Sequence, residues 1–278
     1  MMCPKLTTAP GNFPSLKRLK IERMDQLLPV KQICSNATIL TDLWIKGMPE
    51  LTCIQDVLNK QDLAWLRLEE CPYLNDIHGC GTSLRELRIM NCENLRELPE
   101  NLHQLQALQT LCIMQCPNIK SIAIPSGEHG LTSLQELRFV DCSGLNSLPA
   151  EMLHSRTSLC TLVVRRCPNL VSFPIDLQQT PSLVVLVLSG CPKLTTIPEG
   201  LGRFSCLRVL FIGPFPDSSQ EFELLSAVAS SSVRTLAIVG WPHSNSLPEE
   251  LQYLTNITKL SILNFGSVEA LPDWLGNL

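Results

Sequence analysis

One short pattern of apolar and polar positions recurs along this chain. Its first, fourth and sixth positions are usually leucine, isoleucine or valine, as in LRELRIMNC from Leu84 and LVVLVLSGC from Leu183. Successive side chains of a strand point to opposite faces, so this alternation is typical of a strand with one buried face. Each copy of the pattern therefore predicts a short β-strand.

The pattern falls into register eleven times. The first apolar position of each copy is Leu16, Leu40, Leu63, Leu84, Leu108, Leu134, Leu159, Leu183, Leu207, Val233 or Ile257, and successive copies lie 21 to 26 residues apart. This period is typical of leucine-rich repeats, which stack because one turn cannot bury its own apolar face. The sequence thus predicts an α/β repeat solenoid. It would be a leucine-rich-repeat arc with a parallel concave β-sheet and a convex side of loops or short helices.

The segments between the predicted strands hold two candidate helices, at 99–108 and 221–230. Both have apolar residues at helical spacing. The segments 122–134 and 212–232 depart from the repeat pattern, and insertions of this kind mark either function or tolerated variation. Their role stays open.

The octet CPKLTTAP at 3–10 returns almost unchanged as CPKLTTIP at 191–198, where it is the second half of a repeat. The copy at Cys3 is therefore expected to end a strand. We expect one leucine-rich-repeat domain over residues 1–278, with about eleven registered repeats and a partial one at the N-terminus. Neither end has the polar cap that such solenoids usually need, so the sequence predicts truncation at both ends.

The ninth position of the pattern holds cysteine in six consecutive repeats. These are Cys71, Cys92, Cys116, Cys142, Cys167 and Cys191, and the slot holds Met24, Met48, Phe215, Trp241 and Phe265 in the others. We interpret the cysteines as a structural column, because a buried thiol is a small apolar group and a weak donor to carbonyls of the neighbouring turn. A metal site is an alternative, but a line of thiols is not a tetrahedron and no histidines lie at ligand spacing. Disulfides are another, but parallel Cβ vectors fit that bond poorly.

Composition and charge narrow the function further. Hydrophobic residues make up 45% of the chain, charged residues 17%, and the net charge is −4, which lacks the basic excess of nucleic-acid-binding domains. No apolar run reaches the roughly 18 residues of a membrane span, and the first residues lack the apolar stretch of a secretory signal. Thirteen cysteines without a C-x-x-C pair favour a reducing compartment. We expect a cytoplasmic protein with neither nucleic acid nor membrane as partner.

Motifs for catalysis are absent from the sequence. There is no phosphate-binding loop, no H-E-x-x-H and no G-x-S-x-G, and the five histidines fall in predicted turns and convex segments. Glu69 and Glu70 are adjacent on a strand and point to opposite faces, so they do not form an acid–base pair. The chain is not expected to be an enzyme or to bind a cofactor.

The variable strand positions are expected to form the binding surface, because their side chains face the concave side. Candidate protein-binding residues are Trp44, Arg67, Glu69, Arg88, Arg138, Val163, Arg165, Val185, Val187, Val209 and Phe211. The first half of this set is charged, whereas the valines and Phe211 predict one continuous exposed apolar patch. Such patches rimmed by charge mark interaction sites, and arginine and aromatic residues tend to dominate binding energy. The alternative is that the apolar half packs against a missing domain or missing repeats.

A longer pattern, L-x-x-L-x-I-x-x-C-P-x-L-x-x-[LI]-P, continues from the strand into the turn that follows it. It is clearest in LRELRIMNCENLRELP (84–99), LCTLVVRRCPNLVSFP (159–174) and LVVLVLSGCPKLTTIP (183–198). This pattern resembles the leucine-rich-repeat region of plant intracellular nucleotide-binding leucine-rich-repeat disease-resistance proteins. The resemblance covers nearly the whole chain. The repeats of secreted plant proteins differ, because they carry asparagine in the cysteine slot and a following glycine.

The resemblance implies a recognition module of plant innate immunity. Such a module senses a pathogen effector or a guarded host protein through its concave face, and it restrains a nucleotide-binding domain that is not present in this chain. Adaptors of the F-box type also carry cysteine in the ninth slot, so a substrate-recognition adaptor of a ubiquitin ligase, or a free scaffold, stays open as the alternative. A decayed gene fragment is a third possibility.

Overall fold

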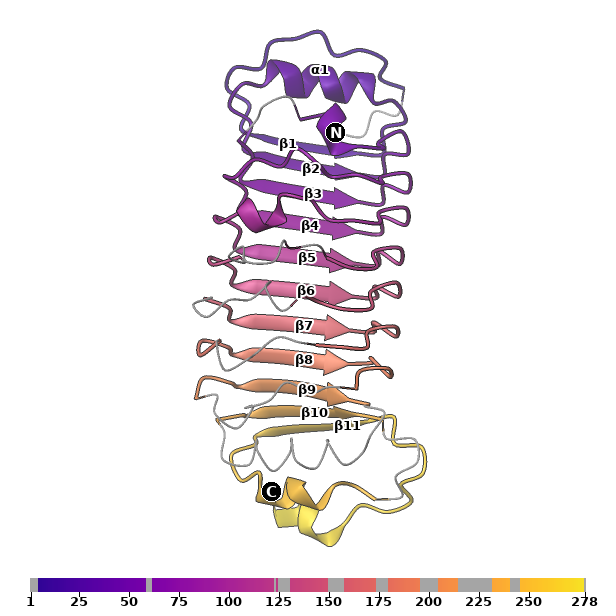
Figure 1. Ribbon diagram of the computed structural model, residues 1–278, viewed down its shortest axis with the longest axis vertical. Helices are drawn as coiled ribbons and strands as arrows, with labels where there is room; N and C mark the ends of the chain where they lie inside the picture. Colours follow the sequence, from indigo (N-terminus) through magenta and orange to yellow (C-terminus); the bar gives the residue numbers. More distant parts are fainter. Residues whose placement is uncertain are drawn as a thin grey trace.

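The computed structural model describes residues 5–58, 62–122, 124, 131–149, 158–173, 180–195, 205–214, 232–240 and 246–277. Eleven five-residue strands follow one another along the long axis of the molecule and form one parallel sheet in sequence order (Figure 1). They are β1 (Arg18–Glu22), β2 (Asp42–Lys46), β3 (Trp65–Glu69), β4 (Glu86–Met90), β5 (Thr110–Met114), β6 (Glu136–Val140), β7 (Thr161–Arg165), β8 (Val185–Ser189), β9 (Val209–Gly213), β10 (Thr235–Val239) and β11 (Lys259–Leu263). The predicted solenoid with a parallel sheet is confirmed.

The repeat pattern determines the register of the sheet. The fourth position of the repeat pattern is the second residue of each strand. It lies beside the same position of the next strand, as Leu66 lies beside Leu87 and Leu87 beside Leu111. The same register holds from the first pair of strands to the last. Side chains of equivalent positions therefore form columns that run across the strands.

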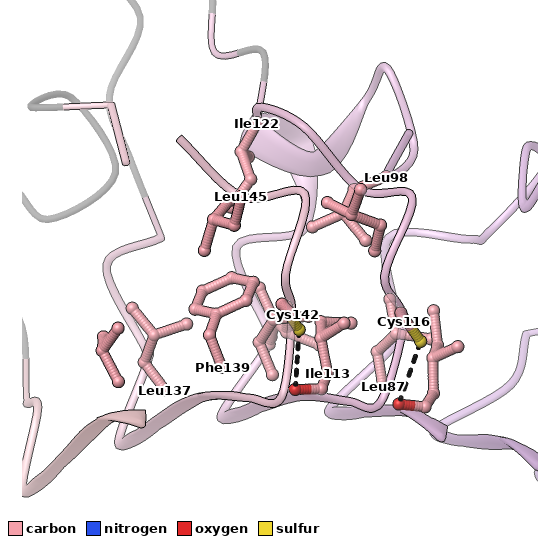
Figure 2. Packing of buried hydrophobic residues seen from close by; sticks show 14 of the residues in the cluster. Leu87, Leu98, Ile113, Cys116, Ile122, Leu137, Phe139, Cys142 and Leu145 are labelled. Carbon is pink, nitrogen blue, oxygen red and sulfur yellow. Dashed lines mark hydrogen bonds between the residues drawn. The ribbon is translucent and has the colours of Figure 1, made fainter. Parts of the chain in front are cut away.

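The inward columns make one continuous hydrophobic core. Leu87, Ile113, Leu137 and Phe139 are fully buried within it, and Figure 2 shows them packed with residues from the following turns. In β11 the equivalent residues are only partly buried, because no described strand lies beyond it. Each repeat thus contributes a few aliphatic side chains, worth roughly 1.5–3 kcal/mol apiece when fully buried.

Most strands are followed directly by a residue with left-handed backbone. Its φ lies between 50° and 70° in Arg23, Gly47, Glu70, Asn91, Gln115, Asp141, Arg166, Gly190, Gly240 and Asn264. This conformation turns the backbone N–H toward the next repeat, where it donates to the carbonyl of the last strand residue. Examples are Glu70 N to Met90 O at 2.9 Å and Asn91 N to Met114 O at 3.0 Å. The interstrand bonding therefore continues one residue beyond most of the strands.

The opposite side of the solenoid contains little helix. The described part has one α-helix, α1 (Leu28–Asn36), and short 3-10 helices η1 (Ile54–Asp56), η2 (Leu102–Gln104), η6 (Glu249–Tyr253) and η7 (Asp273–Asn277). The helix predicted at 99–108 was wrong beyond the single turn η2, because Leu108 already belongs to the next repeat and the chain must extend there. The helix predicted at 221–230 lies outside the described residues, as do Cys3 and most of 122–134 and 212–232.

Sequence reasoning missed helix α1. Its buried residues Val30, Ile33 and Cys34 have helical spacing, and Pro29 lies in the first turn, where its missing N–H leaves no bond unmade. These features were available in the sequence.

Candidate protein-binding surface

The first, third and fifth residues of each strand point away from the core, and we call the surface they form the open face. It is the face that the sequence predicts to be concave. All eleven candidate binding residues lie on it. Val185 and Val209 are first residues, Trp44, Arg67, Arg88, Arg138, Val163, Val187 and Phe211 are third residues, and Glu69 and Arg165 are fifth residues.

The charged side chains on β3 to β6 are paired with one another. Arg67 Nε donates to Glu86 Oε1 at 2.7 Å, and Arg88 Nε lies 2.9 Å from the same oxygen. Arg138 is paired with Glu136, two residues earlier on its own strand. The register does bring the three arginines into one column, as predicted, and two carboxylates on the same face, Glu86 and Glu136, are paired with them.

Two tryptophans lie beside this charged group. The Lys20 Nζ lies 3.7 Å from the centroid of the Trp44 ring, a cation–π contact. Trp65, the first residue of β3, is 37% exposed, and sequence reasoning missed it although its outward position follows from the alternation of β3. Lys46 lies 3.5 Å from Glu69 and 3.1 Å from Glu70, so Glu69 also belongs to an ion pair.

Beyond the arginines, the open face becomes apolar. Val140, Val163 and Val187 form a cluster with Met114, Val185 and Phe211, and we call these six residues the apolar stripe. The prediction of a continuous exposed patch needs correction, because Val140, Val163 and Val187 are only 6–8% exposed. Valine is shorter than the arginine, methionine and phenylalanine around it, so these neighbours cover much of it.

The membership of the apolar stripe also differs from the prediction. Val209 is half-buried on the open face but is not part of the cluster. Met114 and Val140 belong to it and were missed, although both are fifth residues of their strands and point outward by the same alternation. Apolar fifth positions were the sequence signal that could have found them.

A hollow lies at the edge of the sheet where β3 to β6 end. It has a volume of about 650 Å³, and the left-handed residues Glu70, Asn91, Gln115 and Asp141 contribute to its lining. The remaining lining residues are Pro72, Glu93, Asn94, Pro117 and Asn118, all from the turns. Its lining consists of carboxylates, amides and prolines and contains no serine, threonine, cysteine, lysine or histidine.

The six cysteines of the ninth slot lie in the core, each at most 1% exposed. Cys142 Sγ donates to the carbonyl of Ile113 at 3.7 Å and Cys116 Sγ to that of Ile89 at 4.0 Å, as Figure 2 shows. Similar contacts join Cys92 to Leu68 and Cys167 to Phe139. These four thiols thus contact the repeat before them, and each also donates, at a shorter distance, to a carbonyl of its own repeat. Phe215 and Trp241 of the same slot lie outside the described residues.

In this slot the pKa is raised for Cys92, Cys116, Cys167 and Cys191, whereas the hydrogen bond with Cys92 lowers the pKa of Cys71. Burial raises the pKa of Cys116 to about 11, and burial likewise raises the pKa of Cys34 and of Cys80 to about 12. The twelve cysteines in the described part are free thiols, and no group of three or more His, Cys, Asp or Glu there is arranged to hold a metal ion. The six thiols of the slot are buried members of the hydrophobic core, and their role as a structural column stays a prediction.

The repeat period, the parallel sheet and the buried ninth slot are all features of a leucine-rich repeat. The chain folds as a leucine-rich-repeat domain. Leucine-rich-repeat domains are generally protein-binding modules, and the fold usually carries no catalysis. No helix among the described residues is long and apolar enough to cross a bilayer.

Comparisons with known proteins add little to this assignment. No family model matches the chain, and no curated protein matches it either. Among solved structures, the leucine-rich-repeat domain of the type III effector XopL is similar at 23% identity and a TM-score of 0.41, covering 71% of this chain and 76% of that one. A leucine-rich-repeat protein of Leptospira interrogans gives 17% identity, a TM-score of 0.37 and coverage of 96% and 79%. The plant peptide hormone receptor RGFR1, in complex with RGF2, gives 14% identity and a TM-score of 0.32, covering 90% of this chain and 48% of that one.

Proposed function

We propose that this leucine-rich-repeat domain is the recognition region of a plant intracellular immune receptor. It binds a pathogen effector or a guarded host protein through the open face, in the cytoplasm, and it restrains a nucleotide-binding domain that belongs to the same receptor. The observation that carries the binding surface is the apolar stripe beside a group of paired charges and two tryptophans. The immune role is supported by the Cys-Pro repeat pattern, best preserved at 159–174 and 183–198.

The composition of the open face supports recognition of a protein. Tryptophan and arginine are over-represented among residues whose removal costs the most binding energy, and they act in desolvated positions next to apolar contacts. Trp44, Trp65, Arg67 and Arg88 lie within three adjacent strands, and both arginines lie within ion-pair distance of Glu86, which favours these side-chain positions before a partner arrives. Preorganised side chains lose less entropy on binding.

The cysteine slot also supports the alternative function, an F-box-type adaptor that presents substrates to a ubiquitin ligase. Sequencing the transcript upstream of Met1 separates the two. An open frame that leads into a phosphate-binding loop supports the immune receptor, whereas an F-box in that frame supports the adaptor. A frame that encodes neither module removes both proposals.

The binding surface itself is tested in plant tissue. The chain and its Val187→Asp variant are expressed in healthy and pathogen-infected leaves, and cross-linked proteins are identified by mass spectrometry. We expect a partner that cross-links to the native chain in infected leaves and is lost with Val187→Asp. A partner retained by the variant would place recognition elsewhere on the domain.

A further inference from the structure

The apolar stripe crosses the open face obliquely and passes between two arginines. The register of β6 and β7 places Val163 beside Arg138. The next outward pair along the same two strands is Arg165 beside Val140. These four side chains therefore mark the corners of a rectangle, with the valines on one diagonal and the arginines on the other.

The two arginines differ in how their charge is balanced. Arg138 is paired with Glu136 on its own strand. Arg165 is exposed and has no ion pair in the part of the chain that the structure describes. The Arg166 hydrogen bond, and more weakly the charge of Arg165, lower the pKa of Asp141, so that carboxylate is already held by Arg166. One side of the apolar stripe thus presents a cation that a partner can neutralise.

The backbone of the sheet determines which kind of segment can lie on the stripe. The N–H and C=O groups of β5 to β9 are used in pairing between strands, so the open face offers only side chains. An extended peptide laid across these valines would bury its own backbone polar groups without partners, at a cost of roughly 1–3 kcal/mol each. An α-helix bonds its backbone internally and avoids that cost.

The spacing of the strands favours a helix as well. Adjacent strands are about 4.8 Å apart, so the stripe from Met114 on β5 to Phe211 on β9 spans about 19 Å. A helix presents one apolar side chain per turn, every 5.4 Å or so, whereas same-side residues of an extended chain are about 6.7 Å apart. A helical row therefore stays close to the strands over this length, which corresponds to about 13 helical residues.

We infer that the apolar stripe binds one amphipathic α-helix of a partner protein, with an apolar row on the valines and an acidic side chain beside that row paired with Arg165. The helix lies across the strands from β5 to β9. The inference rests on the proposed function, because it specifies the segment of the partner that the open face recognises. Such docking uses the i, i+3, i+4, i+7 spacing of apolar residues on the bound helix.

A selection experiment tests this without knowledge of the natural partner. A displayed library of random peptides of roughly 16 residues, long enough for four helical turns, is selected on the full chain. We expect the enriched peptides to share apolar residues at helical spacing and an acidic residue next to them. Fluorescence anisotropy with the best peptide should show about 100-fold weaker binding to Val187→Asp and about tenfold weaker binding to Arg165→Glu. Exchange of the acidic peptide residue for lysine should restore binding to Arg165→Glu.

Control variants separate binding from folding. Lys259→Glu changes an exposed open-face cation on β11, away from the stripe, and should bind the peptide as the native chain does. Val187→Thr keeps the side-chain shape, and it should weaken binding while circular dichroism stays unchanged. Enriched peptides with alternating apolar residues that still depend on Val187 would overturn the helix and leave the proposed function standing. Peptides indifferent to Val187 and Arg165, or no enrichment at all, would overturn the inference.

Discussion

Gly144 occupies a turn in which any side chain would collide with the preceding repeat. A Cβ at this position would lie 2.3 Å from the carbonyl oxygen of Pro117 and 2.9 Å from that of Ile119. Both are backbone atoms, so a change of side-chain rotamer cannot move them away, and the side chain of Ile119 is buried in the core. Gly144→Ala should therefore destabilise the domain although it adds only a methyl group.

The size of the effect follows from the overlap. Ordinary contacts begin at about 3.4 Å, so the new methyl group would overlap the Pro117 oxygen by about 1.1 Å. Overpacking typically costs about 1–3 kcal/mol when side chains can adjust, and more when they cannot. Since the atoms struck are backbone, we expect a loss of at least about 3 kcal/mol, equivalent to a fall in Tm of roughly 6 °C or more for a chain of this length.

Thermal and urea unfolding followed by far-ultraviolet circular dichroism measure this loss. Gly266→Ala is the matched control, because no atom lies within 4 Å of its Cβ, and it should leave the unfolding free energy within about 0.5 kcal/mol or raise it slightly. A Gly144→Ala protein as stable as the native one would refute the reasoning.

A further variant asks whether the turn can relax. Other repeats have asparagine at the position of Gly144, and the Nδ2 of Asn118 donates to Glu93 O at 2.6 Å while that of Asn169 donates to Ser143 O at 2.7 Å. If the turn at Gly144 could move into that arrangement, Gly144→Asn would be tolerated. We expect it to destabilise the domain more than alanine does.

Three other outcomes are expected. Cys142→Ser should lower the unfolding free energy by about 1–3 kcal/mol, because a strongly hydrated hydroxyl replaces a thiol in the core, whereas Cys160→Ser at an exposed thiol should change it by less than about 0.5 kcal/mol in the same urea titration. Burial raises the pKa of thiols such as Cys116 to about 11, so they stabilise the fold fully below the unfolded pKa near 9, and this stabilisation is lost as pH rises toward 11. The urea midpoint should therefore fall above pH 9. A midpoint that stays constant there would mean that the thiols are solvated. Arg88→Glu combined with Arg138→Glu should abolish partner binding and also lower Tm, because each new carboxylate lies beside an existing one, Glu86 or Glu136. An unchanged Tm would contradict the ion pairs. Arg88→Gln combined with Arg138→Gln is the milder control.

The sequence predicts the sheet of this domain nearly in full. Equal spacing of the apolar residues in SLRELRIMNC and its relatives defines the strands, and the shared frame also defines which residues pair. Leu66 lies beside Leu87 because both are fourth positions, and no tertiary information is needed to deduce it. The open face is predictable for the same reason, since a period of two separates inward from outward residues.

The behaviour of the open-face side chains is not predictable in this way. Whether Glu86 binds one arginine or two depends on side-chain rotamers and on the distance between neighbouring columns, neither of which the repeat pattern contains. The exposure of Val163 depends on the height of its neighbours on two other strands. Helix α1 was missed for a different reason, because the strand period contains no signal for it and only the helical spacing around Val30 and Ile33 indicates it.

The constant register of the strands has a consequence for how the open face can evolve. Measured across the strands, the separation of any two features on that face is a whole number of strand spacings, each about 4.8 Å. Gain or loss of one repeat between Trp65 and Phe211 would shift the two contact regions by one such step and leave the side chains around each of them unchanged. A partner that contacts both regions at once therefore fits only a domain with the right number of repeats between them.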